Sequence, residues 1–188
     1  MYDMAVYALH TVTGILGTVK RVTGMSGIGL KERTFKDQKI DVEMDDNTHL
    51  LLDFGDSVFC LLFASNSYSG PGHGFSVPFI SGSEGGITRG NEGLDIWGRN
   101  VEDGRRVENP GSDMPFVFEP HLELPERHVY SDIMHMVDCV INDREPVISA
   151  EHARHVIEII ELGYKAAEIG QTQEMTTTFS LGKLTVGL

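Results

Sequence analysis

Apolar residues at the start of the chain recur with the 3.6-residue period of an amphipathic helix. The apolar side of this predicted helix carries Ala5, Ala8, Leu9, Val12 and Leu16. Asp3, Tyr7 and His10 fall within about 60° of one another on the opposite side. Glycine often ends a helix in the left-handed conformation, so we expect this helix to end near Gly14 or Gly17. The pattern predicts one face packed on a core and another that presents a carboxylate, a phenol and an imidazole.

A run of strands follows, because apolar and polar residues alternate with the two-residue period of a half-buried strand. The predicted strands are Thr18–Leu30, Ile40–Met44, Thr48–Phe54 and Ser57–Ala64. We expect the last three to form an antiparallel meander from Ile40 to Ala64. Ser57–Ala64 is almost wholly apolar, which predicts a well-buried strand. The charged segment Lys31–Gln38 is interpreted as a loop.

The second half of the chain combines short strands, turn-rich segments and two longer helices. The predicted strands are Phe75–Ile80, Ile87–Arg89, Leu94–Trp97, Arg105–Val107, Phe116–Phe118 and Met175–Phe179. Helical periodicity covers Val129–Asn142 and Ala150–Ile169, and Gly170 stands where a glycine commonly follows a helix. Because the elements do not alternate as βαβ units, the order predicts the α+β class, with an open, mainly antiparallel β-sheet and helices packed on one face.

Length and charge narrow the class of protein. The chain has 188 residues, 40% of them hydrophobic, which fits one globular domain. Its net charge of −13 repels a phosphate backbone and argues against a nucleic-acid partner. We also expect no membrane association, because no apolar run is long enough to span a bilayer and no secretory signal is recognisable. Cys60 and Cys139 lie far apart in apolar surroundings, which is typical of reduced thiols in a cytoplasmic protein.

The histidines and glycines do not form a recognisable metal or phosphate motif. His152 and His155 stand three residues apart on a predicted helix, but neither an HExxH pattern nor a nearby cysteine accompanies them. We interpret both as helix-surface residues and expect no metal site. Gly24, Gly27 and Gly29 follow the order Gly-x-x-Gly-x-Gly, the reverse of the dinucleotide fingerprint, so they predict a strand rather than a phosphate loop.

Asp3, Tyr7 and His10 are the first candidates for chemistry. Steps of four and three residues bring side chains together on one side of a helix. A hydroxyl in this position can transfer a proton when one neighbouring group orients it and another adjusts its pKa. The alternative interpretation is an ordinary solvated polar face.

A second candidate is the small, polar and glycine-rich segment Ser65–Gly74, in which Tyr68 and His73 are the only large side chains. Loops carried on a rigid sheet often hold binding residues. The segment is therefore interpreted either as a substrate-lining loop or as a flexible surface loop.

Three stretches, in order, resemble the second domain of the glucose–fructose oxidoreductase, inositol dehydrogenase and rhizopine-catabolism (Gfo/Idh/MocA) family. The opening YDMAVYALHTVTGILG is similar to the start of that domain, and Asp3 matches the family's Asp while Tyr7 matches its Tyr or His. Phe79–Gly85 is similar to the family's I-x-G-x-x-G hairpin, and Glu145–Ala153 to the EPxxxxEHA entry of its last helix. Together these matches extend from Tyr2 to about Thr172.

The resemblance implies the substrate-binding and oligomerisation domain of an NAD- or NADP-dependent oxidoreductase that acts on the secondary alcohol or ketone of a sugar or polyol. It implies that Tyr7 is the acid–base group and that Asp3 orients Tyr7 or the substrate. We further expect His10, Tyr68 and His73 to bind the sugar-like substrate. The open face of the sheet implies a homo-oligomer.

The departures from the family pattern are equally informative. The family's Rossmann domain, with its GxGxxG loop and Glu-Lys-Pro motif, is missing, and so is the glycine triplet before Asp3. We therefore expect residues 1–188 to be a single domain that binds no cofactor alone and is inactive by itself. One alternative is a free-standing binding or dimerisation module without chemistry. A weaker alternative is a sugar isomerase or lyase that needs no nicotinamide.

Overall fold

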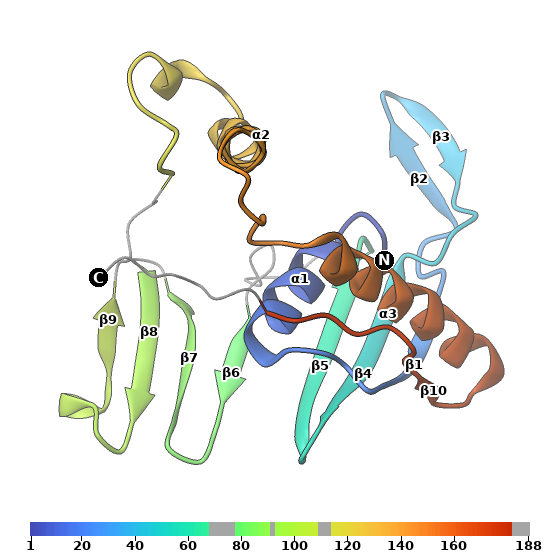
Figure 1. Cartoon of the computed structure of the whole chain (residues 1–188). Helices are drawn as coiled ribbons and strands as arrows, with labels where there is room; N and C mark the ends of the chain where they lie inside the picture. The colour runs from blue at the N-terminus through green and yellow to red at the C-terminus, as the bar shows by residue number, and fades with distance from the viewer. Residues whose placement is uncertain (68–77, 91–92, 109–113, 182–188) are drawn as a thin grey trace. The chain divides into compact units, whose positions relative to one another are not determined.

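The computed structural model describes residues 1–67, 78–90, 93–108 and 114–181. The chain divides into two compact units, a first unit of Met1–Val77 with Ala150–Leu188 and a second unit of Pro78–Ser149. Each unit is described by itself (Figure 1). In the described parts of both, no helix is long and apolar enough to cross a membrane.

The first unit is an antiparallel sheet with two helices against one face (Figure 1). Its strands, in hydrogen-bonded order, are β10 (Gln173–Glu174), β1 (Arg21–Gly27), β4 (Asn47–Gly55) and β5 (Val58–Ser65). The helices are α1 (Ala5–Leu16) and α3 (Ala150–Ile169). Both helices were predicted, and each is followed by a glycine with positive φ, Gly17 at 89° and Gly170 at 67°. This arrangement confirms the α+β class.

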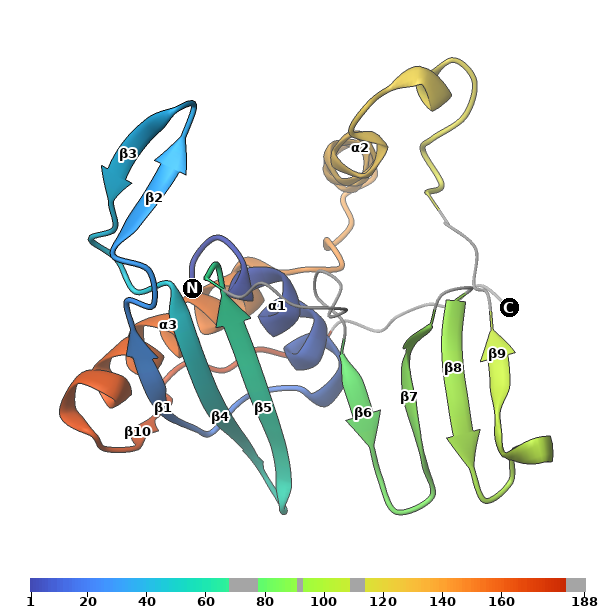
Figure 2. The same ribbon diagram turned by 180° about the vertical axis from the view of Figure 1, so that it is seen from behind.

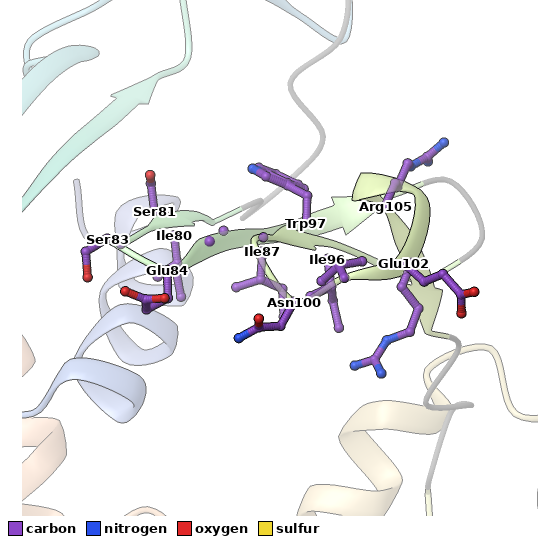
Figure 3. A pocket seen from close by; sticks show the side chains of 16 residues that line it. Ile80, Ser81, Ser83, Glu84, Ile87, Ile96, Trp97, Asn100, Glu102 and Arg105 are labelled. Carbon is purple, nitrogen blue, oxygen red and sulfur yellow. The ribbon is translucent and has the colours of Figure 1, made fainter.

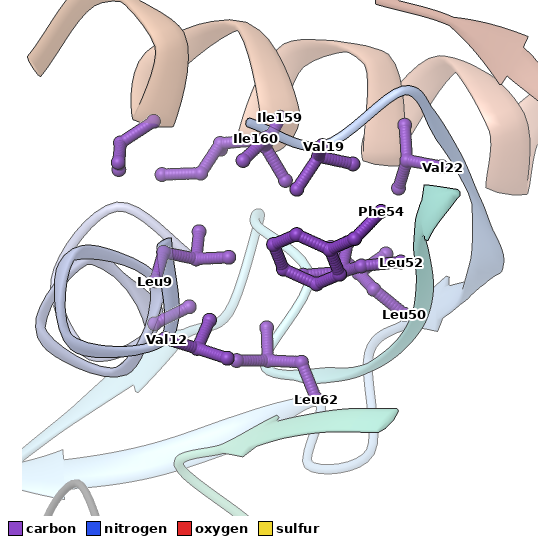
Figure 4. Close-up of a cluster of buried hydrophobic side chains, with 12 residues drawn as sticks. Leu9, Val12, Val19, Val22, Leu50, Leu52, Phe54, Leu62, Ile159 and Ile160 are labelled. Atoms are coloured by element: carbon purple, nitrogen blue, oxygen red, sulfur yellow. The ribbon is translucent and has the colours of Figure 1, made fainter. Parts of the chain in front are cut away.

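The core of the first unit lies between the helices and the sheet (Figure 4). Alternation along β4 turns Leu50, Leu52 and Phe54 towards the helices, as the sequence pattern predicts. The buried apolar cluster is Ala5, Leu9, Val12, Val19, Val22, Leu50, Leu52, Phe54, Leu62, Val156, Ile159 and Ile160. It therefore joins residues of α1, β1, β4, β5 and α3 into one hydrophobic core.

The opposite face of this sheet is apolar and exposed. We call it the open sheet face, and its exposed apolar residues are Met25, Leu51, Phe59, Leu61 and Phe63. The prediction that Ser57–Ala64 is a well-buried strand is wrong, because on β5 only Leu62 is buried and Leu61 is 73% exposed. With helices on one face only, alternate residues of an apolar strand remain outside the core.

A separate hairpin, which the sequence did not predict, lies between β1 and β4. It consists of β2 (Glu32–Phe35) and β3 (Gln38–Asp41), which pair only with each other. The prediction of a meander from Ile40 to Ala64 is therefore wrong in its first strand, although β4 and β5 do form a hairpin. Lys36 and Asp37 both have positive φ, which permits the two-residue turn that joins β2 to β3.

The second unit contains an antiparallel sheet and one long helix. The strands, in hydrogen-bonded order, are β6 (Phe79–Ser81), β7 (Gly85–Gly90), β8 (Gly93–Gly98) and β9 (Arg106–Glu108). The 3₁₀ turns are η1 (Glu102–Gly104) and η2 (His121–Glu123), and the helix is α2 (Arg127–Ile141). The hairpin of β6 and β7 was predicted, as were β8, β9 and α2. The first three residues of the predicted strand Phe75–Ile80 lie outside the described residues.

Two of the predicted strands, Phe116–Phe118 and Met175–Phe179, are wrong. Phe116–Phe118 is not a strand, because the chain turns there and the Val117 N–H donates to the carbonyl of Met114 (2.8 Å). Met175–Phe179 is not a strand either, since β10 ends at Glu174. The Met175 N–H still donates to the carbonyl of Lys20, directly before β1 (2.8 Å), and from Thr176 onwards the backbone N–H groups donate to Glu158 on α3.

Candidate functional site

Helix α1 carries the predicted catalytic pair on its solvent side. Its inner side is fixed by Leu9, which is fully buried, whereas Tyr7 is 53% exposed. Asp3 lies in the turn before α1 and is also exposed. The structure thus confirms the predicted division of this helix into an apolar and a polar face. The catalytic roles of Asp3 and Tyr7 stay predictions.

His10 lies at the margin between α1 and α3 and is half-buried. Its Nδ1 is 2.9 Å from the carbonyl of Val6, so Nδ1 is the protonated nitrogen and Nε2 is left for other partners. The His10 ring centroid lies 5.2 Å from that of His152 on α3. Tyr68 and His73, the other predicted substrate-binding residues, lie outside the described residues.

His152 is buried, which corrects the prediction that it is a helix-surface residue. Only 2% of it is exposed, and its ring stacks on Phe179 with centroids 4.0 Å apart. The Thr13 hydroxyl donates its one hydrogen to the carbonyl of Leu9 (2.6 Å), so His152 Nε2 must donate to that hydroxyl (2.7 Å). Burial lowers the pKa of His152, so the ring is held neutral.

His155 is also a buried residue and not a surface one, with no exposed area. The backbone N–H of Val19 donates to His155 Nε2 (2.9 Å), and His155 Nδ1 therefore donates to Thr177, whose carbonyl and hydroxyl oxygens lie 3.0 and 2.9 Å away. Burial lowers the pKa of His155, outweighing the opposite effects of Thr177 and Glu158. The pair of histidines thus bonds α3 to the end of α1 and to the C-terminal segment.

Glu158 completes this polar layer on α3. Burial alone would raise its pKa, but hydroxyl and backbone N–H donors of Thr176 and Thr177 outweigh burial and lower the pKa to about 2. The two backbone N–H groups lie 3.0 and 2.8 Å from the carboxylate oxygens. These bonds explain why the chain leaves the sheet after β10.

The neutral histidines predict a loss of stability in mild acid. In the unfolded chain, histidines become protonated below their ordinary pKa of about 6.5. In the folded chain His152 and His155 stay neutral at the same pH, because their pKa values are lowered, so the unfolded state binds more protons. The free energy of unfolding should therefore fall as pH drops below about 6.5, by at most about 1.4 kcal/mol per pH unit for each histidine. Urea unfolding between pH 8 and pH 5 measures it, and His155→Gln should flatten the slope.

The control for this prediction is His128→Gln, which removes an exposed histidine at the start of α2. It should leave the pH slope unchanged. An equal change of slope in both variants would contradict the assignment to the buried pair.

A hollow of about 1000 Å³ lies on the sheet of the second unit (Figure 3). Ile80, Ile87 and Ile96 face one side of this sheet, and Trp97 faces the other. The indole of Trp97 lies against Gly86, where an added Cβ would be 3.0 Å from the ring. The sequence identified the hairpin but not the hollow, because the walls of the hollow come from β6, β7, β8, η1 and β9 together.

The described residues do not form a dinucleotide cradle at the glycines considered in the sequence. Gly24 and Gly27 both belong to β1, which pairs along its length with β4. A Cβ at Gly24 would lie 2.2 Å from the carbonyl oxygen of His49, so the strand backbone and not a phosphate fills that space. No helix begins after these glycines, as the dinucleotide fingerprint requires. Among the residues described, no group of three metal-ligating side chains occurs.

Comparison with known proteins supplies the wider context. Residues 1–175 match a family model described as the oxidoreductase family, C-terminal alpha/beta domain (GFO_IDH_MocA_C). No curated protein matches the chain in sequence.

Solved structures share the fold. An oxidoreductase from Agrobacterium radiobacter, in complex with NAD+, L-tartaric acid and magnesium, is 18% identical with a TM-score of 0.68, over 92% of this chain and 48% of that one. An NAD-binding oxidoreductase from Klebsiella pneumoniae is 18% identical with a TM-score of 0.73, over 93% of this chain and 50% of that one. Levoglucosan dehydrogenase in complex with NADH and L-sorbose is 16% identical with a TM-score of 0.73, over 93% of this chain and 50% of that one. The chain thus spans about half the length of these proteins.

Proposed function

Because the chain belongs to the Gfo/Idh/MocA oxidoreductase family as its C-terminal α/β domain, we propose that residues 1–188 are one substrate-binding and oligomerisation domain of an NAD- or NADP-dependent oxidoreductase. The complete enzyme oxidises a secondary alcohol of a sugar or polyol, or reduces the ketone. We assign binding of the nicotinamide to another domain of that enzyme, because the similar oxidoreductases are about twice as long as this chain. This chain contributes substrate binding and proton handling.

The placement of Tyr7 carries the proposal. Helix α1 is fixed through Leu9, which has no exposed area, while Tyr7 keeps 53% of its surface exposed on the other side. A phenol on a rigid helix can approach a bound ligand without moving the backbone. Asp3 precedes Tyr7 by four residues, in the turn that leads into α1, and we propose that its carboxylate orients the phenol or a substrate hydroxyl.

The proton is the part of the reaction that this chain handles. When a secondary alcohol becomes a ketone, the hydroxyl proton must leave as the carbon loses a hydride to the nicotinamide. We assign that proton to Tyr7 Oη, which returns a proton to the carbonyl oxygen in the reverse direction.

The ligands of the structural neighbours support a polyhydroxylated substrate. One of these proteins was solved with L-sorbose and another with L-tartaric acid. Both molecules carry adjacent secondary hydroxyl groups, which a carboxylate, a phenol and an imidazole can bind by hydrogen bonds. We therefore propose that Asp3, Tyr7 and His10, together with Tyr68 and His73, bind such a molecule.

The test is an absorbance assay of the complete enzyme that contains this domain, with NAD+ or NADP+ and a panel of sugars, polyols and simple alcohols. Nicotinamide reduction with polyhydroxylated alcohols is the expected result. Turnover of a sugar with no change in the nicotinamide would instead support an isomerase or lyase, and would contradict the proposal.

The open sheet face is the proposed surface of self-association. Burying a leucine contributes about 1.5–3 kcal/mol, so Leu61→Asp should weaken self-association about tenfold or more. Light scattering after size-exclusion chromatography measures this across a dilution series. The control, Gln171→Asp, adds the same charge at an exposed residue after α3. Equal association of both variants and the unmodified chain would contradict the assignment.

A second candidate function is a binding or dimerisation module without chemistry. The exposed apolar residues of the open sheet face favour it, because an assembly role alone would explain them. The two proposals make different predictions for the accessibility of Tyr7 and Asp3 in the assembled protein. If Tyr7 and Asp3 become covered when the chain self-associates, the module is favoured, whereas an accessible pair in the assembled protein favours the enzyme domain.

A further inference from the structure

The hairpin of β2 and β3 leaves the first unit between β1 and β4 and pairs with no strand of the main sheet (Figure 2). Its strands have four residues each, and at about 3.3 Å per residue they reach about 13 Å. An isolated two-stranded hairpin is only marginally stable in water. A hairpin of this kind therefore depends on a fixed base, on a partner surface, or on both.

The base of the hairpin is fixed by Asp46, which is only 7% exposed. Its carboxylate accepts a hydrogen bond from the Gly29 N–H (2.5 Å) and forms an ion pair with Arg33 (2.6 Å). Its backbone N–H donates to the carbonyl of Gly27 at the end of β1 (3.1 Å), and its carbonyl accepts from the N–H of Asn66 just after β5 (2.8 Å). The hairpin is thus held in one direction, which lowers the entropic cost of docking it on another surface.

One face of the hairpin is polar. The pairs Glu32↔Asp41 and Thr34↔Lys39 place these four residues on the same face. All four are exposed, and the Lys39 ammonium forms an ion pair with Glu32 (2.6 Å). This face is suited to remain in contact with water.

The other face, which we call the docking face, carries Arg33, Phe35, Gln38 and Ile40. None of these residues is acidic, and Phe35 and Ile40 are 61% and 46% exposed. The Lys36 ammonium lies 5.3 Å from the centre of the Phe35 ring. Aromatic residues and arginine are enriched at protein interfaces, whereas aspartate and glutamate are depleted there. The docking face therefore has the composition of a contact surface, which the polar face lacks.

The hairpin leaves the sheet at the end where α1 begins (Figure 2). Tyr2, directly before Asp3, has its ring centroid 6.3 Å from that of Tyr164 on α3. Burial and, next, the negative charge of Asp45 raise the pKa of Tyr164, so Asp45 lies near the same ring. Asp45 directly precedes Asp46, the residue that fixes the hairpin. The base of the hairpin and the entry to α1 are thus neighbours.

Hydride transfer requires a second domain at this end of the sheet. The carbon that loses a hydride to the nicotinamide carries the hydroxyl whose proton we assign to Tyr7, and that hydroxyl must lie about 2.6–3.2 Å from Tyr7 Oη. The domain that holds the nicotinamide must therefore cover the exposed side of α1. A small domain is about 30 Å across, so a domain in this position also reaches the neighbouring hairpin.

We propose that the docking face of the hairpin packs on the nicotinamide-binding domain of the same enzyme, with Phe35 and Ile40 at the centre of the contact. The inference rests on the proposed function, because that function supplies the second domain. It goes beyond that function by assigning a contact between the two domains to a surface outside both α1 and the open sheet face.

Cysteine labelling tests the two faces separately. Ile40→Cys places a thiol on the docking face, and the control Lys39→Cys places one on the polar face of the same strand. Alkylation by iodoacetamide is compared between residues 1–188 alone and the complete enzyme, with peptide mass mapping to count Cys60 and Cys139 separately. We expect the thiol of Ile40→Cys to react about tenfold more slowly in the complete enzyme, because it reacts only when the contact opens. The thiol of Lys39→Cys should react at similar rates in both proteins.

Three results would overturn the proposal. The first is an equal rate for Ile40→Cys in the two proteins. The second is equal slowing of Ile40→Cys and Lys39→Cys in the complete enzyme, which would mean that the docking face is not distinct. The third is a thiol of Ile40→Cys that is protected in residues 1–188 alone and becomes reactive on dilution, which would assign the face to a second copy of this chain.

The same preparation of the complete enzyme separates this proposal from the proposed function. Reduction of the nicotinamide together with a freely reactive thiol in Ile40→Cys overturns the docking and leaves the proposed function in place. A protected thiol in an enzyme that reduces no nicotinamide contradicts the proposed function and supports only the contact between domains.

If Ile40→Cys does not unfold cooperatively, amide hydrogen exchange of the unmodified proteins replaces the labelling. Slower exchange of the amides of β2 and β3 in the complete enzyme than in residues 1–188 alone is the expected result. Equal exchange in the two proteins would overturn the proposal.

Discussion

Replacing Tyr7 with phenylalanine is expected to lower kcat of the complete enzyme by about 10²–10⁴-fold, the usual contribution of a positioned acid–base group. The change removes only the hydroxyl oxygen that accepts or donates the substrate proton. KM should change little, because a proton transferred in the transition state contributes little to ground-state binding. Reduction of the nicotinamide under saturating substrate measures the effect.

The matched control is Tyr2→Phe, which removes a phenol hydroxyl from an exposed tyrosine at the entry to α1 (42% exposed). It should keep nearly full activity. If Tyr2→Phe lowers kcat as much as Tyr7→Phe, the loss comes from a disturbed helix and not from a missing acid–base group. Unchanged kcat in Tyr7→Phe would remove Tyr7 from the reaction.

Replacing Leu50 with alanine is expected to lower the free energy of unfolding of this chain by about 2–5 kcal/mol. Leu50 has no exposed area and lies between β1 and α3. A Cβ added at Gly163 would lie only 3.0 Å from its methyl groups, and one at Gly24 would lie 2.6 Å from one of them. The leucine fills a space that both glycines leave open, so its loss creates a cavity in the centre of the core.

Leu51→Ala is the control. It removes the same atoms as Leu50→Ala, but from the open sheet face, where Leu51 is 46% exposed. Its effect on the free energy of unfolding should stay within about 0.5 kcal/mol in dilute solution. Urea unfolding of both variants measures the difference. Similar losses for both would contradict the assignment of the two faces of β4.

The elements with a clear hydrophobic period could be predicted from the sequence. The two faces of α1, the buried stripe of α3 and the hairpin of β4 and β5 all follow from local patterns. The degree of burial of β5 could not be predicted, since an apolar strand looks the same whether one face or two faces are covered. Whether one face or both faces of β5 are covered depends on where the helices pack against the sheet.

Polar residues in the interior were the main failure of prediction. His152 and His155 are buried because Thr13 and Thr177 satisfy their ring nitrogens, and these partners are far away in the sequence. The hairpin of β2 and β3 was missed because its strands are charged and its turn uses Lys36 and Asp37 at positive φ, without a glycine. Such features depend on long-range partners or on an unusual backbone conformation, which a hydrophobic pattern does not reveal.

The central claim is that this domain works as one part of an NAD- or NADP-dependent oxidoreductase. It is tested most directly by capturing the native protein from its source with an antibody against this domain, and by measuring the intact mass of each captured chain. We predict a chain roughly twice the length of this domain, because the domain spans about half of each similar structure. A native protein of this domain's own mass, captured without any nicotinamide-binding chain, would contradict the account.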